Sequence, residues 1–332
     1  MRLSFIDSLC EQAEKDERIW LLCGDLGYSV LEKFIERFPG RFINVGVAEQ
    51  NMIGVAAGLA LSGKVVFVYS IANFVTMRCL EQIRNDVGYH NLDVKIVGVG
   101  GGVAYGSAGY THHALEDLAA MRLMPNMTVI APGDPQEARL ATAALATTPG
   151  PAYLRLGKAG ERSVHTDLHA FRIGEAIPVR TEGDVTLIST GGTLSLAMQA
   201  HEALAAQGVA ARVLSMPTFS PLDRAAILKV ATETSHVITL EDHGLGGLGS
   251  AVAEVLAEAS LPVRFTPLRI RGITSDTVGS QAAIHAAHGL SVSGILQAVE
   301  SYRTREEPPG AAIRTVRTQE DLPVAKNAKE SR

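Results

Sequence analysis

Short apolar segments alternate with longer helical patterns along most of this sequence. The first half contains six strand-like runs, at residues 19–25, 41–47, 64–70, 94–100, 127–132 and 152–156. Helical patterns lie between them, for example at 73–89 and 134–148. Strands that are apolar almost throughout, and that alternate with helices, indicate a parallel sheet covered by helices on both faces. The pattern therefore predicts an α/β fold with doubly wound topology.

A second, smaller series of the same kind begins after about residue 175. Strand-like runs at 184–191, 210–217, 236–242 and 263–270 alternate with helical patterns at 194–207, 221–232 and 249–259. We predict a first domain at 1–160, a linker at 161–180 and a second domain at 181–302. Residues 303–332 are charged and proline-bearing without apolar periodicity, so we expect them to be disordered.

Composition excludes several classes of function. With 332 residues, 46% of them apolar, the chain can bury a large core in two domains. A net charge of −5, with 5% aromatic residues and no basic block, argues against nucleic acid as a partner. Apolar runs stay short of the roughly 18–20 residues that span a bilayer, and residues 1–20 mix charges into a helical pattern. We expect a soluble, cytoplasmic protein without membrane contact.

The three cysteines are Cys10, Cys23 and Cys79, widely spaced in apolar surroundings. This pattern supports neither a disulfide framework nor a cysteine metal site, and we interpret all three as core residues. The run GLGGLG at 244–249 matches the spacing of a dinucleotide-binding loop, but the following strand lacks the acid that would hold a ribose. We interpret its glycines as a tight turn that lets helix and sheet pack closely.

Glu49 stands between a strand-like run and a helical pattern almost free of charge. An acid in the first turn of a helix is stabilised by the helix dipole, and that role alone could explain it. The helix that follows is rich in small residues, Gly54, Ala57, Gly58 and Ala60, so we expect it to be buried on most sides. A carboxylate at the start of such a helix loses hydration and needs a partner. A ligand nitrogen would serve.

Residues 44–63, 70–89 and 109–138 resemble the pyrimidine-binding domain of transketolases and their thiamine-diphosphate relatives. Residues 187–200 and 238–256 resemble the transketolase C-terminal domain, so the resemblance covers about residues 1–300. It implies a thiamine-diphosphate pyrimidine-binding domain followed by a transketolase C-terminal domain. The implied activity is transfer of a two-carbon ketol unit from a ketose phosphate donor to an aldehyde acceptor.

The resemblance also implies roles for three residues at the cofactor. The acid matching Glu49 holds N1′ of the aminopyrimidine, a contact that promotes removal of the C2 proton of the thiazolium. Phe74 would stack on the pyrimidine and Asn73 would shape the same wall. As an alternative, Phe74 is simply a core aromatic residue.

Other positions match the family less evenly. His112 matches a histidine near the reacting carbons, where it can donate to an oxyanion or relay a proton, and His113 stands where other members often carry Gln. Arg155 aligns with an arginine that pairs with sugar phosphate, although it could instead bridge to a neighbouring acid. Asp25 and Ser29 fall in the region of the cofactor and phosphate channel, where a turn or helix-capping role competes.

Two departures from the family bear on substrate and subunit composition. Ala108 and Gly100 replace an acid and a histidine that contact the donor in typical transketolases, so the donor cannot be inferred from the fold. The family's GDG motif, with its following Asn, binds the diphosphate through Mg²⁺ and is absent here. We therefore expect no metal ligands in this chain. A partner subunit carrying the diphosphate-binding domain would complete an (αβ)2 heterotetramer.

Two alternatives remain open. One is the β subunit of the thiamine-dependent component of a 2-oxoacid dehydrogenase, which has the same domain order but a different loop around the histidine that matches His112. The other is a non-catalytic α/β scaffold subunit, against which the joint presence of Glu49, Phe74 and His112 argues.

Overall fold

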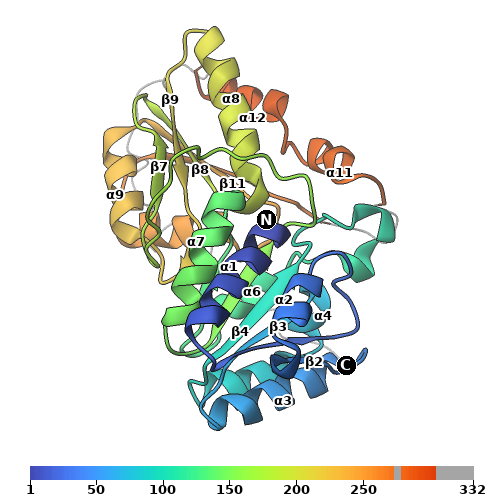
Figure 1. Cartoon of the computed structure of the whole chain (residues 1–332). Helices are drawn as coiled ribbons and strands as arrows, with labels where there is room; N and C mark the ends of the chain where they lie inside the picture. The colour runs from blue at the N-terminus through green and yellow to red at the C-terminus, as the bar shows by residue number, and fades with distance from the viewer. Residues whose placement is uncertain (273–277, 304–332) are drawn as a thin grey trace, which may run out of the picture.

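The computed structural model describes residues 1–272 and 278–303, which form two α/β units (Figure 1). The first contains a seven-stranded sheet in the order β10-β5-β6-β4-β3-β1-β2. Its strands are β1 (Ile19–Cys23), β2 (Phe42–Asn44), β3 (Val65–Ile71), β4 (Val94–Val99), β5 (Thr128–Ile130), β6 (Ala152–Leu156) and β10 (Thr218–Ser220). Neighbouring strands are parallel except for β10, which pairs antiparallel with β5. The predicted α/β class is confirmed.

Helices cover both faces of this sheet. On β3, Phe67 and Tyr69 share one apolar cluster with three helices, whereas Val66 and Val68 share another cluster that includes three different helices of the same unit. Successive side chains of a strand point to opposite faces, so the two sets of helices lie on opposite sides. The first set is α1 (Arg2–Lys15), α2 (Glu32–Arg37) and α7 (Pro135–Thr147), and the second is α3 (Glu49–Leu61), α4 (Ala72–Met77) and α6 (Asp117–Arg122).

The second unit contains a five-stranded sheet in the order β12-β11-β8-β9-β7. Its strands are β7 (Ile177–Arg180), β8 (Val185–Ser189), β9 (Ala211–Ser215), β11 (His236–Leu240) and β12 (Arg264–Leu268). Its helices are α8 (Leu194–Ala206), α9 (Arg224–Glu233), α10 (Leu248–Glu258), α11 (Gln281–Ala287) and α12 (Val292–Arg303). Strand β7 falls inside the segment predicted as a linker and pairs with β9, so the second sheet begins there.

Two local expectations from the sequence differ from the structure. The segment predicted as one helix at 73–89 is divided into α4, the short helix α5 (Leu80–Gln82) and a π-helical turn over Ile83–Gly88. The sequence pattern does not predict strand β10, which places a piece of the second half of the chain at the edge of the first sheet. The predicted disordered segment lies, from residue 304 onward, outside the described residues.

The segment Gln281–Ser301 is apolar enough, and at 21 residues long enough, to suggest a membrane span by composition. In the structure it is divided between α11 and α12, with Gly289 at a φ of 77° between them. Neither helix alone approaches the roughly 20 residues needed to cross a bilayer. Ile295 and Val299 of α12 are buried in a core to which α8 also contributes, and α8 and α12 lie side by side (Figure 1).

The glycine run at 244–249 surrounds the carboxylate of Glu241, which is fully buried. Glu241 accepts hydrogen bonds from the backbone N–H groups of Leu248 and Gly249 at the start of α10. A Cβ atom at Gly247 would lie 2.0 Å from the Glu241 carboxylate, and one at Gly249 would lie 2.8 Å from Pro267. The glycines thus permit close packing, as interpreted from the sequence, and the chain's own carboxylate occupies the helix start that a dinucleotide phosphate would need.

Glu241 predicts a specific pH dependence of stability. Burial raises its pKa to about 7, although the two N–H groups oppose that shift. A raised carboxyl pKa means that the folded state holds the proton more tightly. The contribution of Glu241 to the free energy of unfolding is therefore fully present below the ordinary glutamate pKa of about 4.3, and it is lost as the pH rises through about 7.

We expect the free energy of unfolding of Glu241→Gln, relative to the native chain, to improve between pH 5 and pH 8. Gln keeps the shape but does not ionise. Denaturant titrations at both pH values measure the difference, with the exposed Glu202→Gln as the control. A difference that stays constant with pH, as in the control, would contradict this account.

Candidate active site

The residues singled out from the sequence follow the carboxyl ends of the parallel strands of the first sheet. Asp25 follows β1, Glu49 follows β2, Phe74 follows β3 and His112 follows β4. Ligands of open α/β sheets bind outside these strand ends, because the connecting loops and helix starts meet there. The topology therefore gathers residues that are far apart in sequence at one edge of the sheet.

Glu49 is the first residue of α3, and its side chain is 1% exposed. No side chain caps this helix, so the carboxylate itself provides negative charge at the helix start. It packs against the end of β1, where a Cβ at Gly24 would lie 3.8 Å from the Glu49 carboxylate. The expected burial of this acid is confirmed.

The partner of Glu49 is Arg78, which the sequence pattern does not suggest. Arg78 Nη1 donates to Glu49 Oε2 at 2.7 Å. The Arg78 guanidinium carbon also lies 5.2 Å from the centroid of the Phe74 ring. Arg78 stands at the break between α4 and α5, and such a break in a long helical pattern is not visible in the sequence. We call Glu49, Phe74, Arg78 and His112 the Glu49 site.

Phe74 connects this ion pair with His112. The Phe74 and His112 rings meet edge to face with centroids 5.1 Å apart. Asn73 Nδ2 donates to the carbonyl oxygen of Thr111 at 2.8 Å, which ties α4 to the turn that carries His112. The structure thus brings together Glu49, Phe74, Asn73 and His112. Their roles toward a cofactor or substrate remain predictions.

The two adjacent histidines differ in environment. His112 is half-buried, and its Nδ1 lies 3.0 Å from the Thr111 hydroxyl. His113 is 1% exposed, and neither of its ring nitrogens has a hydrogen-bond partner among the described residues. His113 lines a cavity of about 510 Å³ together with Asn73, Phe74 and Arg78. His113 thus adds a buried imidazole without a hydrogen-bond partner among the described residues to the wall of this cavity.

Asp25 and Ser29 lie in the exposed loop after β1, and both adopt left-handed backbone conformations, with φ values of 57° and 62°. Asn44 holds the loop, because its Nδ2 donates to Asp25 Oδ1 at 2.9 Å and its Oδ1 accepts from the Asp25 N–H. The Ser29 N–H donates to Glu32 Oε1 at 2.7 Å. Both residues therefore fill turn positions here, the alternative that the sequence left open, and among the described residues neither forms a hydrogen bond or ion pair with the Glu49 site.

Arg155 lies at the junction of the two units and is 6% exposed. Its Nε donates to Asp117 Oδ2 at 2.8 Å, and its Nη2 donates to the carbonyl oxygens of Ala114 and Asp242. Arg155 thus forms the acid bridge that the sequence left as an alternative. Arg155 does border an interdomain cavity of about 450 Å³, so the structure leaves its predicted substrate role untested.

Three successive glycines after β4 make room for large side chains. A Cβ at Gly100 would lie 2.0 Å from the Tyr105 ring, one at Gly101 2.3 Å from Arg155 Nε, and one at Gly102 2.1 Å from Asp242 Cγ. The position where the family carries a histidine, Gly100, is thus covered by Tyr105. Real Cβ atoms do not approach other atoms this closely, so a larger residue here would displace these side chains.

Tyr105 lies between His112 and Lys158, and Lys158 is a cation that the sequence analysis did not select. The Tyr105 and His112 ring centroids are 6.2 Å apart, and Lys158 Nζ lies 4.6 Å from the Tyr105 centroid. Lys158 is exposed at the end of β6, whereas Arg155 is buried within that strand. The exposed ammonium is therefore better placed than the buried guanidinium to meet an anionic substrate group. Only the packing of Tyr105 over Gly100 reveals this, because the spacing of the residues gives no such signal.

These placements predict effects of very different size on stability for two substitutions. Arg155→Met should lower the free energy of unfolding by about 3–5 kcal/mol, because it leaves the buried Asp117 carboxylate without its cation. Lys158→Met should change it by less than about 0.5 kcal/mol, as expected at an exposed position. Urea titrations of the two variants measure both values. Similar small losses in both would show that Arg155 does not anchor the junction.

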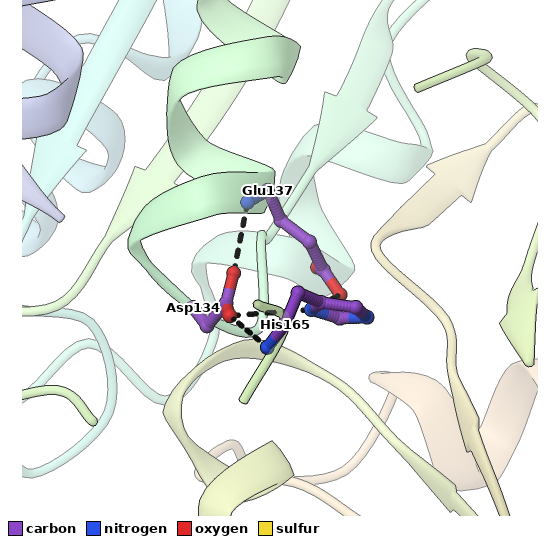
Figure 2. A group of neighbouring side chains, drawn as sticks. All are labelled: Asp134, Glu137 and His165. Carbon is purple, nitrogen blue, oxygen red and sulfur yellow. Dashed lines mark hydrogen bonds and ion pairs between the residues drawn. The ribbon is translucent and has the colours of Figure 1, made fainter. Parts of the chain in front are cut away.

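A separate group of titratable residues holds the linker (Figure 2). Asp134 Oδ1 accepts from the Glu137 N–H, and Asp134 Oδ2 accepts from the N–H groups of Val164 and His165 and lies 3.2 Å from His165 Nδ1. Burial alone would raise the pKa of Asp134, but these hydrogen bonds hold it at about 2. Burial raises the pKa of Glu137 to about 7.

Asp134, Glu137 and His165 are side chains of the types that bind metals, and their ligand atoms lie within 4.8 Å of one another. The oxygens of Asp134 are already surrounded by N–H donors from the start of α7 and from the linker. We therefore assign this group to holding residues 164 and 165 at the start of α7.

Two tandem α/β units of the doubly wound class place a buried acid, an aromatic ring and a histidine at the strand ends of the first unit. Residues 1–161 match the family "Transketolase, pyrimidine binding domain" and residues 174–295 match "Transketolase, C-terminal domain". The chain therefore belongs to the transketolase family, which confirms the resemblance seen in the sequence.

Relatives of similar length are subunits of split transketolases. The chain is 42% identical over 299 residues to an apulose-4-phosphate transketolase subunit of Phocaeicola vulgatus, covering 89% of this chain and 94% of that protein. It is 39% identical over 310 residues to "6-deoxy-6-sulfo-D-fructose transketolase subunit SqwH" of a Clostridium species, covering 92% and 95%. A solved structure, "Split gene transketolase, inactive beta4 tetramer", superposes with a TM-score of 0.80 at 36% identity, covering 90% of this chain and 96% of that one.

Proposed function

We propose that this chain is the smaller subunit of a thiamine-diphosphate-dependent transketolase that transfers a two-carbon ketol unit from a ketose phosphate to an aldehyde. The observation that carries the proposal is the geometry of the Glu49 site. A buried carboxylate there faces a flat, hydrogen-bonding cationic group that lies over an aromatic ring. An aminopyrimidine is also flat and nitrogen-bearing, so the Glu49 site fits the pyrimidine half of the cofactor.

Thiamine diphosphate, when bound, supplies the carbon nucleophile that accepts the ketol unit. Glu49 would share a proton with the pyrimidine N1′, and its burial would strengthen that contact, because water does not compete for the carboxylate. Phe74 would pack against the pyrimidine face. His112, half-buried beside Phe74, can donate a proton to the substrate oxygen as negative charge develops on it.

A partner subunit would bind the diphosphate and Mg²⁺. The names of the relatives as subunits support a partner, and so does the surface of α3. Gly54 and Gly58 are exposed, with open space where a Cβ would stand, and Leu61 on the same helix is 70% exposed. The expectation that α3 is buried on most sides is wrong for the isolated chain, because this glycine face is uncovered. We propose an (αβ)2 assembly in the cytoplasm in which the partner covers it.

The test of the proposal is Glu49→Gln in the complex reconstituted with the partner subunit. We expect turnover to fall on the order of a hundredfold, as for a positioned acid–base group, with folding intact. Exchange of the cofactor's C2 proton for deuterium, followed by NMR, should slow as well. Glu81→Gln is the matched control, because Glu81 is exposed nearby on α5. An unchanged exchange rate for Glu49→Gln would show that Glu49 only stabilises the start of α3.

We further propose a specialised sugar donor. Ala108 is exposed in the turn that precedes His112, and it offers no hydrogen bond where typical family members carry an acid. Tyr105 covers Gly100, so an aromatic ring replaces the imidazole at that wall. Lys158 and His112 remain available on either side of Tyr105 for an anionic group and the reacting carbon. This wall would accept donors with altered stereochemistry or substitution beyond the carbonyl.

Restoring the family's acid at position 108 should shift the donor preference toward ordinary ketose phosphates. We expect Ala108→Asp to raise kcat/KM for xylulose 5-phosphate roughly tenfold relative to the native donor, the worth of about one regained hydrogen bond. Ser107→Asp adds the same charge one residue away and should leave the ratio unchanged. If the unmodified complex already uses xylulose 5-phosphate efficiently and Ala108→Asp changes nothing, the specialised-donor proposal is wrong.

A further inference from the structure

Arg78 makes, within the Glu49 site, the two contacts that the pyrimidine is proposed to make. Its Nη1 donates to Glu49 Oε2 at 2.7 Å, as a ring nitrogen would. Its guanidinium, which is planar, lies over the Phe74 ring with its central carbon 5.2 Å from the centroid. One side chain therefore occupies both the hydrogen-bonding position and the stacking position.

We propose that Arg78 is an internal substitute for the pyrimidine, which the cofactor displaces from Glu49 when it binds. This inference rests on the proposed function. It concerns the free chain, in which Arg78 keeps the Glu49 site filled.

The difference in exposure between the two partners makes such an exchange feasible. Glu49 is 1% exposed and fixed at the start of α3, whereas the Arg78 side chain is 47% exposed. A buried carboxylate without a partner is strongly unfavourable, so the free chain needs a cation at this place. Arg78 can instead turn to water with little loss, because it is already half hydrated.

Competition by Arg78 lowers the apparent affinity of the ligand. When only a fraction of the molecules has an open site, the apparent dissociation constant rises by the reciprocal of that fraction. Occupancy of the site by Arg78 in about nine molecules of ten would weaken binding roughly tenfold. The cofactor would then bind well only when the partner's contacts to the diphosphate add to those of the pyrimidine. Arg78 would thus couple cofactor loading to subunit assembly.

Binding of the pyrimidine fragment to the full chain tests the proposal directly. The probe is 4-amino-5-hydroxymethyl-2-methylpyrimidine, followed by saturation-transfer NMR and calorimetry without diphosphate, Mg²⁺ or partner. We expect Arg78→Gln to bind this fragment at least tenfold more tightly than the native chain. Arg78→Lys should bind with intermediate affinity, because an ammonium can pair with Glu49 but cannot lie flat on Phe74.

Two further variants serve as controls. Arg84→Gln alters an exposed arginine of the same segment whose Nη1 donates to Asn85, and it should leave the affinity unchanged. The double variant Glu49→Gln with Arg78→Gln should lose the gain, which would show that the gain depends on the Glu49 carboxylate. Melting curves report the folding of each variant, and Arg78→Lys provides the comparison if Arg78→Gln is unstable.

Equal or weaker binding by Arg78→Gln and Arg78→Lys would overturn the proposal. If Glu49→Gln then still slows C2 proton exchange in the reconstituted complex, the proposed function stands without the substitute. If Arg78→Gln gains affinity but Glu49→Gln leaves exchange and turnover unchanged, the displacement is real and the proposed function fails.

Discussion

Burial of the Glu49 carboxylate is the constraint around which the first unit is arranged. The acid stands at the start of α3 with 1% of its side chain exposed, so its charge must be balanced by nearby groups. The helix start supplies part of that balance, and Arg78 supplies a full positive charge. Arg78 reaches the carboxylate because the helical segment after Phe74 breaks at residues 78–79. The break thus allows a positive charge to balance the buried carboxylate at the start of α3.

A second arginine, Arg155, links the two units. Arg155 pairs with Asp117 in the first unit and donates to the carbonyl oxygen of Asp242 in the second. The two arginines therefore differ in kind. Arg155 is enclosed and holds the fold together, whereas Arg78 is half-exposed and can leave its partner. The substrate role that the family resemblance implies for Arg155 stays a prediction.

The sequence predicted those features that depend on local pattern. Apolar strands alternating with helices indicated the parallel sheets, and the charge-free helix after Glu49 pointed to a buried acid. The sequence did not predict features that depend on contacts between distant segments. Strand β10 forms only because it finds the edge of β5, and Arg78 becomes a partner of Glu49 only after α3 and α4 pack together. Likewise, Tyr105 covers Gly100 through a loop whose path no periodicity describes.

The uncovered glycine face of α3 and the Glu49–Arg78 ion pair at its start both bear on how a subunit stays folded without its partner. In the proposed assembly, a split enzyme must keep half of an active site folded while the other half is absent. Apolar surface such as Leu61 can await a partner at modest cost, since single exposed apolar residues are tolerated in folded proteins. A buried charge cannot wait in the same way, because leaving it unpaired destabilises the folded state directly. In that proposed assembly, the free subunit can leave the glycine face of α3 uncovered, but it must fill the Glu49 site with a side chain of its own.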